Sequence, residues 1–117
     1  MFSKKIKIIL IFLLFYQSPL LSKSNNSNDF NAVNISKYFS GIVAFENKDN
    51  SNALNYFNSS KILLNRHDPY LEKLVMSQVL ENKVTQAINN IKLNIGRTNS
   101  DFFEAYLLLA LDSLKKK

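Results

Sequence analysis

The side chains that could carry out chemistry are few, and their spacing argues against a reactive centre. His67 is the only histidine, and the residues around it (65–69) supply no second histidine, cysteine or carboxylate cluster at the spacing of metal ligands. A serine nucleophile would need this histidine nearby and a glycine-containing turn to expose it, yet the chain has only two glycines. We therefore interpret His67 as a solvent-exposed turn residue and expect no metal or cofactor.

Acid–base catalysis would need two carboxylates on one sheltered surface. Asp68 and Glu72 share the start of one expected helix, and Glu81 lies about two and a half turns beyond Glu72. We interpret these carboxylates as helix caps and solvated surface. The sequence therefore predicts a protein that is not an enzyme.

The length and charge of the chain narrow its class further. A chain of 117 residues allows one small domain, and two separated glycines cannot form a phosphate-binding loop. The net charge of +6 comes from lysines at the two ends, and the charges between the ends are scattered singly. A nucleic-acid-binding protein would concentrate basic residues on one face, so we expect no nucleic-acid partner. The abundance of Asn and Lys is typical of an A+T-rich bacterial genome.

Residues 1–24 have the layout of a secretory signal peptide. Lys4, Lys5 and Lys7 precede nine apolar or aromatic residues (8–16), which are too few to span a bilayer. A proline follows, and residues 22–24 (Ser-Lys-Ser) form a small-x-small cleavage site. We expect an exported protein, periplasmic or secreted, with an uncleaved membrane anchor as the alternative. Residues 25–34 are polar and aperiodic, so we interpret them as a linker.

From residue 35 to residue 117 the apolar residues recur with the spacing of helices. Five such stripes cover residues 35–43, 53–64, 71–79, 84–95 and 102–113, and no segment alternates with the period of a strand. We expect Asn34, Asp68 (followed by Pro69) and Ser100 to cap three of these helices, and Gly96 to end the fourth in a left-handed conformation. These patterns predict an all-α domain over residues 35–117.

The helices repeat with a period of 34 residues. Residues 53–55 (Ala-Leu-Asn) recur as residues 87–89 (Ala-Ile-Asn), and Gly41 and Phe57 align with Val75 and Ile91. A helix–turn–helix unit of this length is the period of the tetratricopeptide repeat (TPR), and the chain resembles that family over residues 35–117. The first unit carries the small and aromatic signature residues Gly41, Ala53, Phe57 and Ser60, and the third begins with residues 104–106 (Glu-Ala-Tyr). The signature tryptophan and the proline that ends each unit are missing.

This resemblance implies an α-solenoid of antiparallel helix pairs, with two TPR-like units and the first helix of a third. In TPR proteins the first helices line a concave groove that binds peptides. The residues expected to point into that groove are Lys37, Ser40, Phe45, Lys73, Ser77, Gln78 and Leu108. We therefore expect a non-catalytic protein–protein interaction scaffold or adaptor that binds a peptide or protein segment. Two alternatives stay open: the N-terminal part of a longer TPR protein whose functional part lies beyond Lys117, or a small secreted helical-bundle effector.

The last expected helix is apolar on all sides, which is unusual for a helix that ends an array. One face can cover the preceding helices, but Phe103, Leu107, Leu111 and Leu114 are left without a partner. We expect that the open reading frame continues beyond Lys117. The alternatives are that the protein self-associates through this helix, or that the lysine stems of residues 115–117 fold over the exposed stripe and the helix frays.

Overall fold

The computed structural model describes residues 31–117. It contains α2 (Ala32–Glu46), α3 (Asn50–Ser59), α4 (Pro69–Leu80), α5 (Val84–Leu93) and α6 (Phe103–Lys115), with the short 3-10 helices η2 (Lys61–Asn65) and η3 (Thr98–Ser100). No strand occurs in this part of the chain, so the expected all-α class is confirmed. The expected signal peptide (1–24) and most of the expected linker lie outside the described residues.

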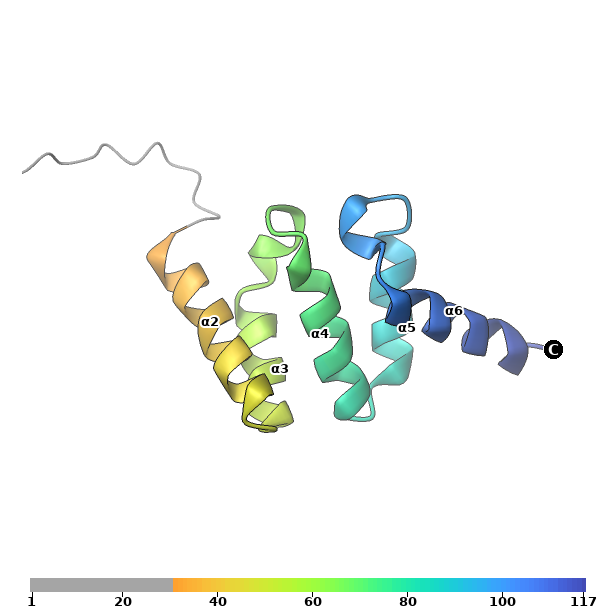
Figure 1. The fold of residues 1–117 in the computed structure, drawn as a ribbon, viewed down its shortest axis with the longest axis horizontal. Coiled ribbons are helices and arrows are strands. Elements are labelled where there is room, and N and C mark those ends of the chain that lie inside the picture. Colours follow the sequence, from red (N-terminus) through yellow and green to blue (C-terminus); the bar gives the residue numbers. More distant parts are fainter. Residues whose placement is uncertain (1–30) are drawn as a thin grey trace, which may run out of the picture.

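The helices lie side by side in chain order, with α2 at one end of the row and α6 at the other (Figure 1). Each helix contacts the next one in the chain, and the C-terminal end of α6 points away from the other helices. The turns from α2 to α3 and from α4 to α5 are three residues long, and each contains one residue with positive φ, Lys48 (63°) and Asn82 (61°). Such short turns hold consecutive helices against each other.

The first helix begins earlier than the sequence indicates. Asn31 is the N-cap of α2, and its side chain accepts a 2.8 Å hydrogen bond from the backbone N–H of Asn34. The expected cap, Asn34, is therefore wrong, and residues 32–34 belong to the helix and not to the linker. Two asparagines three residues apart offer the same capping chemistry, so sequence alone does not choose between them.

Two other expected caps are also wrong. Asp68 precedes Pro69 at the start of α4 as expected, but its side chain caps no helix N–H because its own backbone is helical (φ −53°, ψ −43°). The Ser100 hydroxyl donates to the carbonyl oxygen of Arg97 at 2.8 Å, and α6 begins only at Phe103. Gly96 has the expected left-handed φ of 85°, although it lies in the turn after α5, which ends at Leu93.

The expected helix over residues 53–64 is divided in two. Helix α3 ends at Ser59, and the Ser60 hydroxyl donates to the carbonyl oxygens of Tyr56 and Phe57, at 3.0 and 3.3 Å. The backbone N–H of Ser60 donates to the same two carbonyl oxygens, so the side chain competes with the backbone for these acceptors where the α-helix ends. The chain then continues as η2, which places Leu63 in the core.

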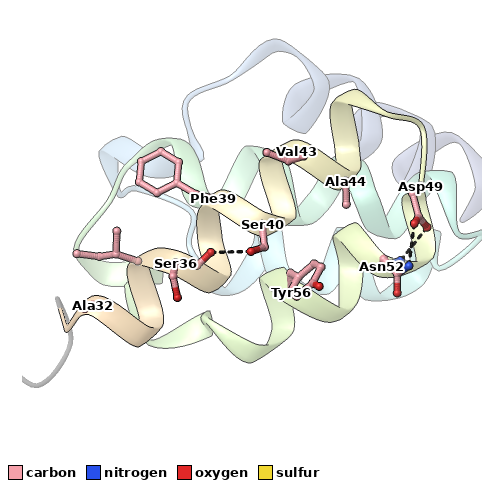
Figure 2. A pocket seen from close by; sticks show the side chains of 10 residues that line it. Ala32, Ser36, Phe39, Ser40, Val43, Ala44, Asp49, Asn52 and Tyr56 are labelled. Atoms are coloured by element: carbon pink, nitrogen blue, oxygen red, sulfur yellow. Dashed lines mark hydrogen bonds between the residues drawn. The ribbon is translucent and has the colours of Figure 1, made fainter.

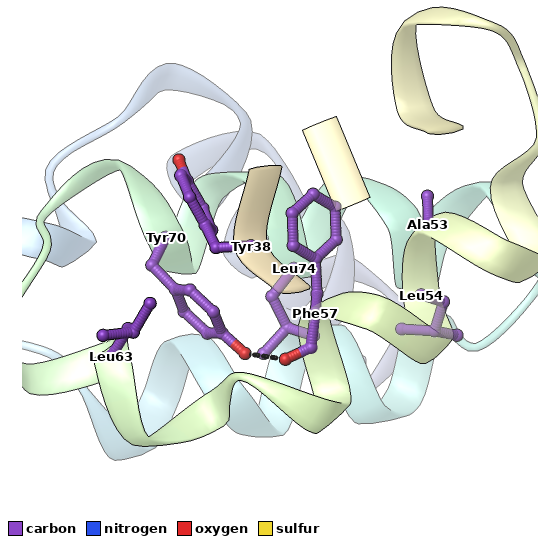
Figure 3. Packing of buried hydrophobic residues seen from close by; sticks show 7 residues of the cluster. All are labelled: Tyr38, Ala53, Leu54, Phe57, Leu63, Tyr70 and Leu74. Carbon is purple, nitrogen blue, oxygen red and sulfur yellow. Dashed lines mark hydrogen bonds between the residues drawn. The ribbon is translucent and has the colours of Figure 1, made fainter. Parts of the chain in front are cut away.

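An aromatic cluster joins α2, α3 and α4 (Figure 3). Its buried residues are Tyr38, Ala53, Leu54, Phe57, Leu63, Tyr70 and Leu74. The Tyr70 hydroxyl donates to the backbone carbonyl of Phe57, and burial raises the pKa of this phenol. Gly41 lies directly over Phe57, where an added Cβ would come within 2.6 Å of a ring carbon. Helices α2 and α3 can therefore approach this closely only because residue 41 has no side chain.

A second cluster joins α4, α5 and α6. Its buried residues are Leu71, Val75, Ala87, Ile88, Ile91, Ala105 and Leu108. Leu64 packs against both clusters and makes the core continuous along the row. The turns at one end of the helices are also tied together, because Asn99 Nδ2 donates to the carbonyl oxygen of Leu64 at 2.9 Å and Arg97 donates to Asn65 Oδ1 at 2.5 Å.

Candidate functional site: an apolar groove on helices α2 and α3

An open groove of about 880 Å³ lies along α2 and α3, at the first end of the row of helices (Figure 2). Helix α2 supplies seven of the lining residues: Ala32, Ile35, Ser36, Phe39, Ser40, Val43 and Ala44. Asp49, Asn52 and Tyr56, at the start of α3 and within it, line the rest. Residues 36, 39, 40 and 43 share one side of α2 because they are three or four positions apart.

The apolar side chains of the groove are largely open to solvent. Phe39 and Val43 are 60% and 61% exposed, and Tyr56 across the groove is 41% exposed. Tyr38 and Gly41, on the adjoining face of α2, are buried in the core, and the Phe39 ring packs edge to face against the Tyr38 ring, with 5.7 Å between the ring centres. The result is an apolar surface on a helix pair that is fixed by its own packing, which is the usual form of a site for another protein segment.

The polar residues of the groove lie beside this apolar surface. The Ser40 hydroxyl donates to the carbonyl oxygen of Ser36 at 2.9 Å, so the Ser40 oxygen is left as an acceptor. Asp49 caps α3 by accepting from the Asn52 backbone N–H at 3.3 Å, and its other oxygen accepts from Asn52 Nδ2 at 2.7 Å (Figure 2). Asp49 is the one charged residue among the ten that line the groove. The groove therefore favours an apolar ligand with neutral or basic polar groups.

The other residues expected to bind a partner fall into two groups. Lys37, Phe45 and Lys73 are half-buried at the surface, and Lys73 Nζ lies 5.1 Å from the centre of the Phe45 ring. This cation–π contact joins α2 to α4, so Lys73 and Phe45 already have partners within the fold. Of the expected residues, Ser40 alone lines the groove.

Ser77, Gln78 and Leu108 lie inside the molecule. The Ser77 hydroxyl donates to the carbonyl oxygen of Lys73 at 2.9 Å, and Gln78 Oε1 accepts from Asn90 Nδ2 at 3.0 Å. Leu108 packs in the core between α6 and the preceding helices. The expectation that these three residues face an accessible groove is corrected by their burial within the row of helices.

Sequence reasoning missed the exposed residues of the groove. Phe39, Val43 and Tyr56 belong to the helical apolar stripes, and such stripes are normally interpreted as core. The useful signal was the width of the first stripe, because Phe39 and Val43 lie at its outer edge, next to the buried Tyr38. The helices that pack against α2 cover only one side of so wide an apolar stripe, and the other side stays exposed.

The single histidine packs against a tyrosine of the core. His67 is half-buried and not solvent-exposed as expected, and its Nε2 lies 3.1 Å from the Tyr38 hydroxyl, with the two rings edge to face. Burial, and secondarily the negative charge of Glu72, raise the pKa of Tyr38 above its ordinary value. Within residues 31–117 no group of three or more His, Cys, Asp or Glu side chains is placed to hold a metal ion. None of the helices described in this region is long and apolar enough to cross a membrane.

Comparison with known proteins gives no match: no protein-family model, no curated protein and no solved structure matches this chain. The geometry of the groove and of the exposed helix faces is therefore the basis for assigning a function.

Proposed function

We propose that this chain is an exported, non-catalytic interaction module that binds a peptide or protein segment in the groove of α2 and α3. The open, apolar groove on a well-packed helix pair carries this proposal. Export follows from the charged, apolar and polar order of residues 1–24, and the membrane is contacted only through that segment if it is not cleaved.

The same proposal includes a TPR-like solenoid of antiparallel helix pairs. Its support is the 34-residue period together with the placement of the small residues. Gly41 contacts the Phe57 ring, and Ala53 and Ala87, which are 34 residues apart, are both fully buried. Small residues at these positions allow the two helices of each unit to cross closely, as the TPR pattern requires.

The chemistry of the groove defines the class of partner. An amphipathic helix with apolar residues three or four apart would place them on Phe39, Val43 and Tyr56. A Lys or Arg at the edge of that helix would meet Asp49, since Asp49 is the one charged residue among the ten described residues that line the groove. A nucleic acid does not fit this surface because its phosphates need basic residues.

The test is a peptide selection followed by binding measurements on matched variants. Peptides from a random displayed library are selected on the purified full-length chain, and the dissociation constants of the best are measured by fluorescence anisotropy. We expect Val43→Asp, which puts a charge in the apolar groove, to weaken binding at least tenfold. Leu93→Asp is the matched control, because Leu93 is, like Val43, an exposed apolar residue of a helix (79%) but lies on α5, outside the groove.

The proposal is contradicted if no selected peptide binds above an unrelated helical protein, or if Val43→Asp and Leu93→Asp change binding equally. Circular dichroism of both variants establishes that the helices are intact. Since both side chains are mostly exposed, neither substitution removes core packing.

A further inference from the structure

We infer that α6 pairs antiparallel with the α6 of a second copy of this chain, which makes the protein a symmetric dimer. One face of α6 has no partner among residues 31–117, the part of the chain that the structure describes. Phe103, Leu107, Leu111 and Leu114 are between 47% and 74% exposed, as the sequence indicated for this helix. These residues are three or four positions apart and form a continuous stripe of about three turns.

The stripe is separate from the face by which α6 is attached to the rest of the molecule. Ala105 and Leu108 are buried in the second core cluster, and Asp112 forms an ion pair with Lys92 of α5 at 2.6 Å. These three residues hold the helix from the opposite side. The C-terminal part of α6 also points away from the row of helices, so a second helix can approach it (Figure 1).

The charges beside the stripe fit a second copy in the antiparallel direction. Glu104 lies near the start of α6 and Lys115 near its end, and eleven residues, or about three turns, bring them to the same edge of the stripe. Among the described residues neither forms an ion pair. In an antiparallel pair the same edges face each other, so Glu104 of each copy meets Lys115 of the other. In a parallel pair opposite edges of the stripe face each other, so Glu104 and Lys115, which share one edge, would not meet.

The apolar stripe is self-complementary in the same arrangement. When Glu104 is beside Lys115 of the second copy, Phe103 lies opposite Leu114, and Leu107 lies opposite residues 110 and 111. A two-fold axis repeats each contact, so the stripe of each molecule covers the stripe of the other. The interface consists of one helix from each chain. A single helix face buries less area than the roughly 800 Å² per partner that is typical of stable dimers. We therefore expect a dimer that dissociates on dilution, and cross-linking in the producing cell is the suitable measurement.

The chain has no cysteine, so single cysteines can report the direction of the pair without a background reaction. Phe103→Cys and Leu114→Cys are made separately in the full-length chain and co-expressed, and the cells are treated with a short bismaleimide. We expect a covalent dimer only when both variants are present, with residue 103 linked to residue 114. In this register residue 114 lies about 16 Å along the axis from residue 114 of the second copy, so each variant alone stays near background.

Leu93→Cys is the control for random collision, because Leu93 is even more exposed than the stripe but lies on α5. The inference is overturned if the mixture of variants gives no more dimer than Leu93→Cys. It is also overturned if Leu114→Cys alone links efficiently, which would indicate a parallel pair. Linking of Leu114→Cys to Val43→Cys would show instead that α6 occupies the α2–α3 groove of another copy.

A charge exchange tests the direction of the pair independently of cysteine geometry. In the cross-linking pair of variants, Glu104→Lys alone or Lys115→Glu alone places like charges together and should reduce the dimer about two- to fivefold per ion pair. The double exchange Glu104→Lys/Lys115→Glu should restore it. Recovery would not follow from a purely structural role of either residue, and its failure would contradict the antiparallel pairing.

Discussion

The contact between Gly41 and Phe57 gives the most direct test of how the first two helices pack. In Gly41→Ala the new Cβ would lie 2.6 Å from Phe57 Cε1 and 2.8 Å from Cδ1, well inside van der Waals contact. The Phe57 ring is fully buried, with the Tyr38 and Tyr70 rings 5.9 and 6.2 Å from it, centre to centre. The ring therefore cannot turn aside without displacing two other aromatic side chains.

The expected size of the effect is the difference between two opposing contributions. Overpacking a core contact costs about 1–3 kcal/mol. Replacing glycine by alanine inside a helix stabilises it by about 0.8–1 kcal/mol. We expect Gly41→Ala to lower the free energy of unfolding by up to about 2 kcal/mol. For a domain of this size each kcal/mol corresponds to a fall in Tm of about 4–8 °C.

Urea unfolding followed by circular dichroism measures this effect, and a double-mutant cycle assigns it to the contact. Phe57→Leu shortens the side chain opposite residue 41, so Gly41→Ala in that background should be neutral or stabilising. Asn89→Ala compared with Asn89→Gly, at an exposed position of α5, measures the helix-propensity contribution without the contact. A stabilisation of about 1 kcal/mol by Gly41→Ala in the wild-type chain would refute the reasoning, because only the propensity contribution would then be present.

Two further predictions concern the packing of the units and the attachment of α6. Ala53→Leu and Ala87→Leu add volume at two fully buried positions and should each cost about 1–3 kcal/mol in urea unfolding; thermally neutral substitutions at both would refute the 34-residue register. Asp112→Asn should lower the Tm at neutral pH, because the hydrogen bonds from Lys92 and then Lys116 hold the pKa of Asp112 below its ordinary value of 3.8. Since the folded pKa is lowered, this contribution is present above that value and is lost as the pH falls through the folded pKa. The Tm difference between wild type and Asp112→Asn should therefore narrow below about pH 4, and a difference independent of pH would contradict the ion-pair assignment.

The helical class could be predicted because its signal is repeated over many residues. Each apolar stripe contains several residues at helical spacing, so one misplaced residue does not change the interpretation. The close crossing at Gly41 and the buried Ala53 and Ala87 could also be located, since a missing or minimal side chain that recurs at a fixed period indicates where two helices approach closely.

Helix ends could not be predicted with the same success, because several residues near each end have equivalent capping chemistry. Asn31 and Asn34 are the same residue type, and the choice between them depends on where the backbone enters α2. Ser100 has a capping side chain, but it donates to Arg97 within its own turn. Which of several neighbouring polar side chains caps a helix depends on the local backbone conformation, and the sequence pattern does not specify that conformation.

The candidate groove illustrates why surface is harder to predict than core in a row of helices. A helix in the middle of the row has neighbours on two sides, so residues such as Ser77 and Gln78 are buried although their polarity suggests surface. Among the described helices α2, at the end of the row, has one sequential neighbour, and its Phe39 is exposed although it is apolar. Burial therefore depends on position in the row as well as on residue type.

Helix α6 combines both effects in one element. Its sequence is apolar on all sides, and no pattern within it distinguishes Leu108, which is buried, from Leu107, which is 47% exposed. The difference arises from the direction in which α4 and α5 approach, which is fixed by contacts made elsewhere in the chain. An apolar helix of this kind at the end of a row is incomplete by itself, because the burial that stabilises one half leaves the other half in water. The apolar stripe alone does not determine the direction in which a second α6 binds. Glu104 and Lys115, at opposite ends of one edge, favour the antiparallel direction because each can pair with the opposite charge of the second copy.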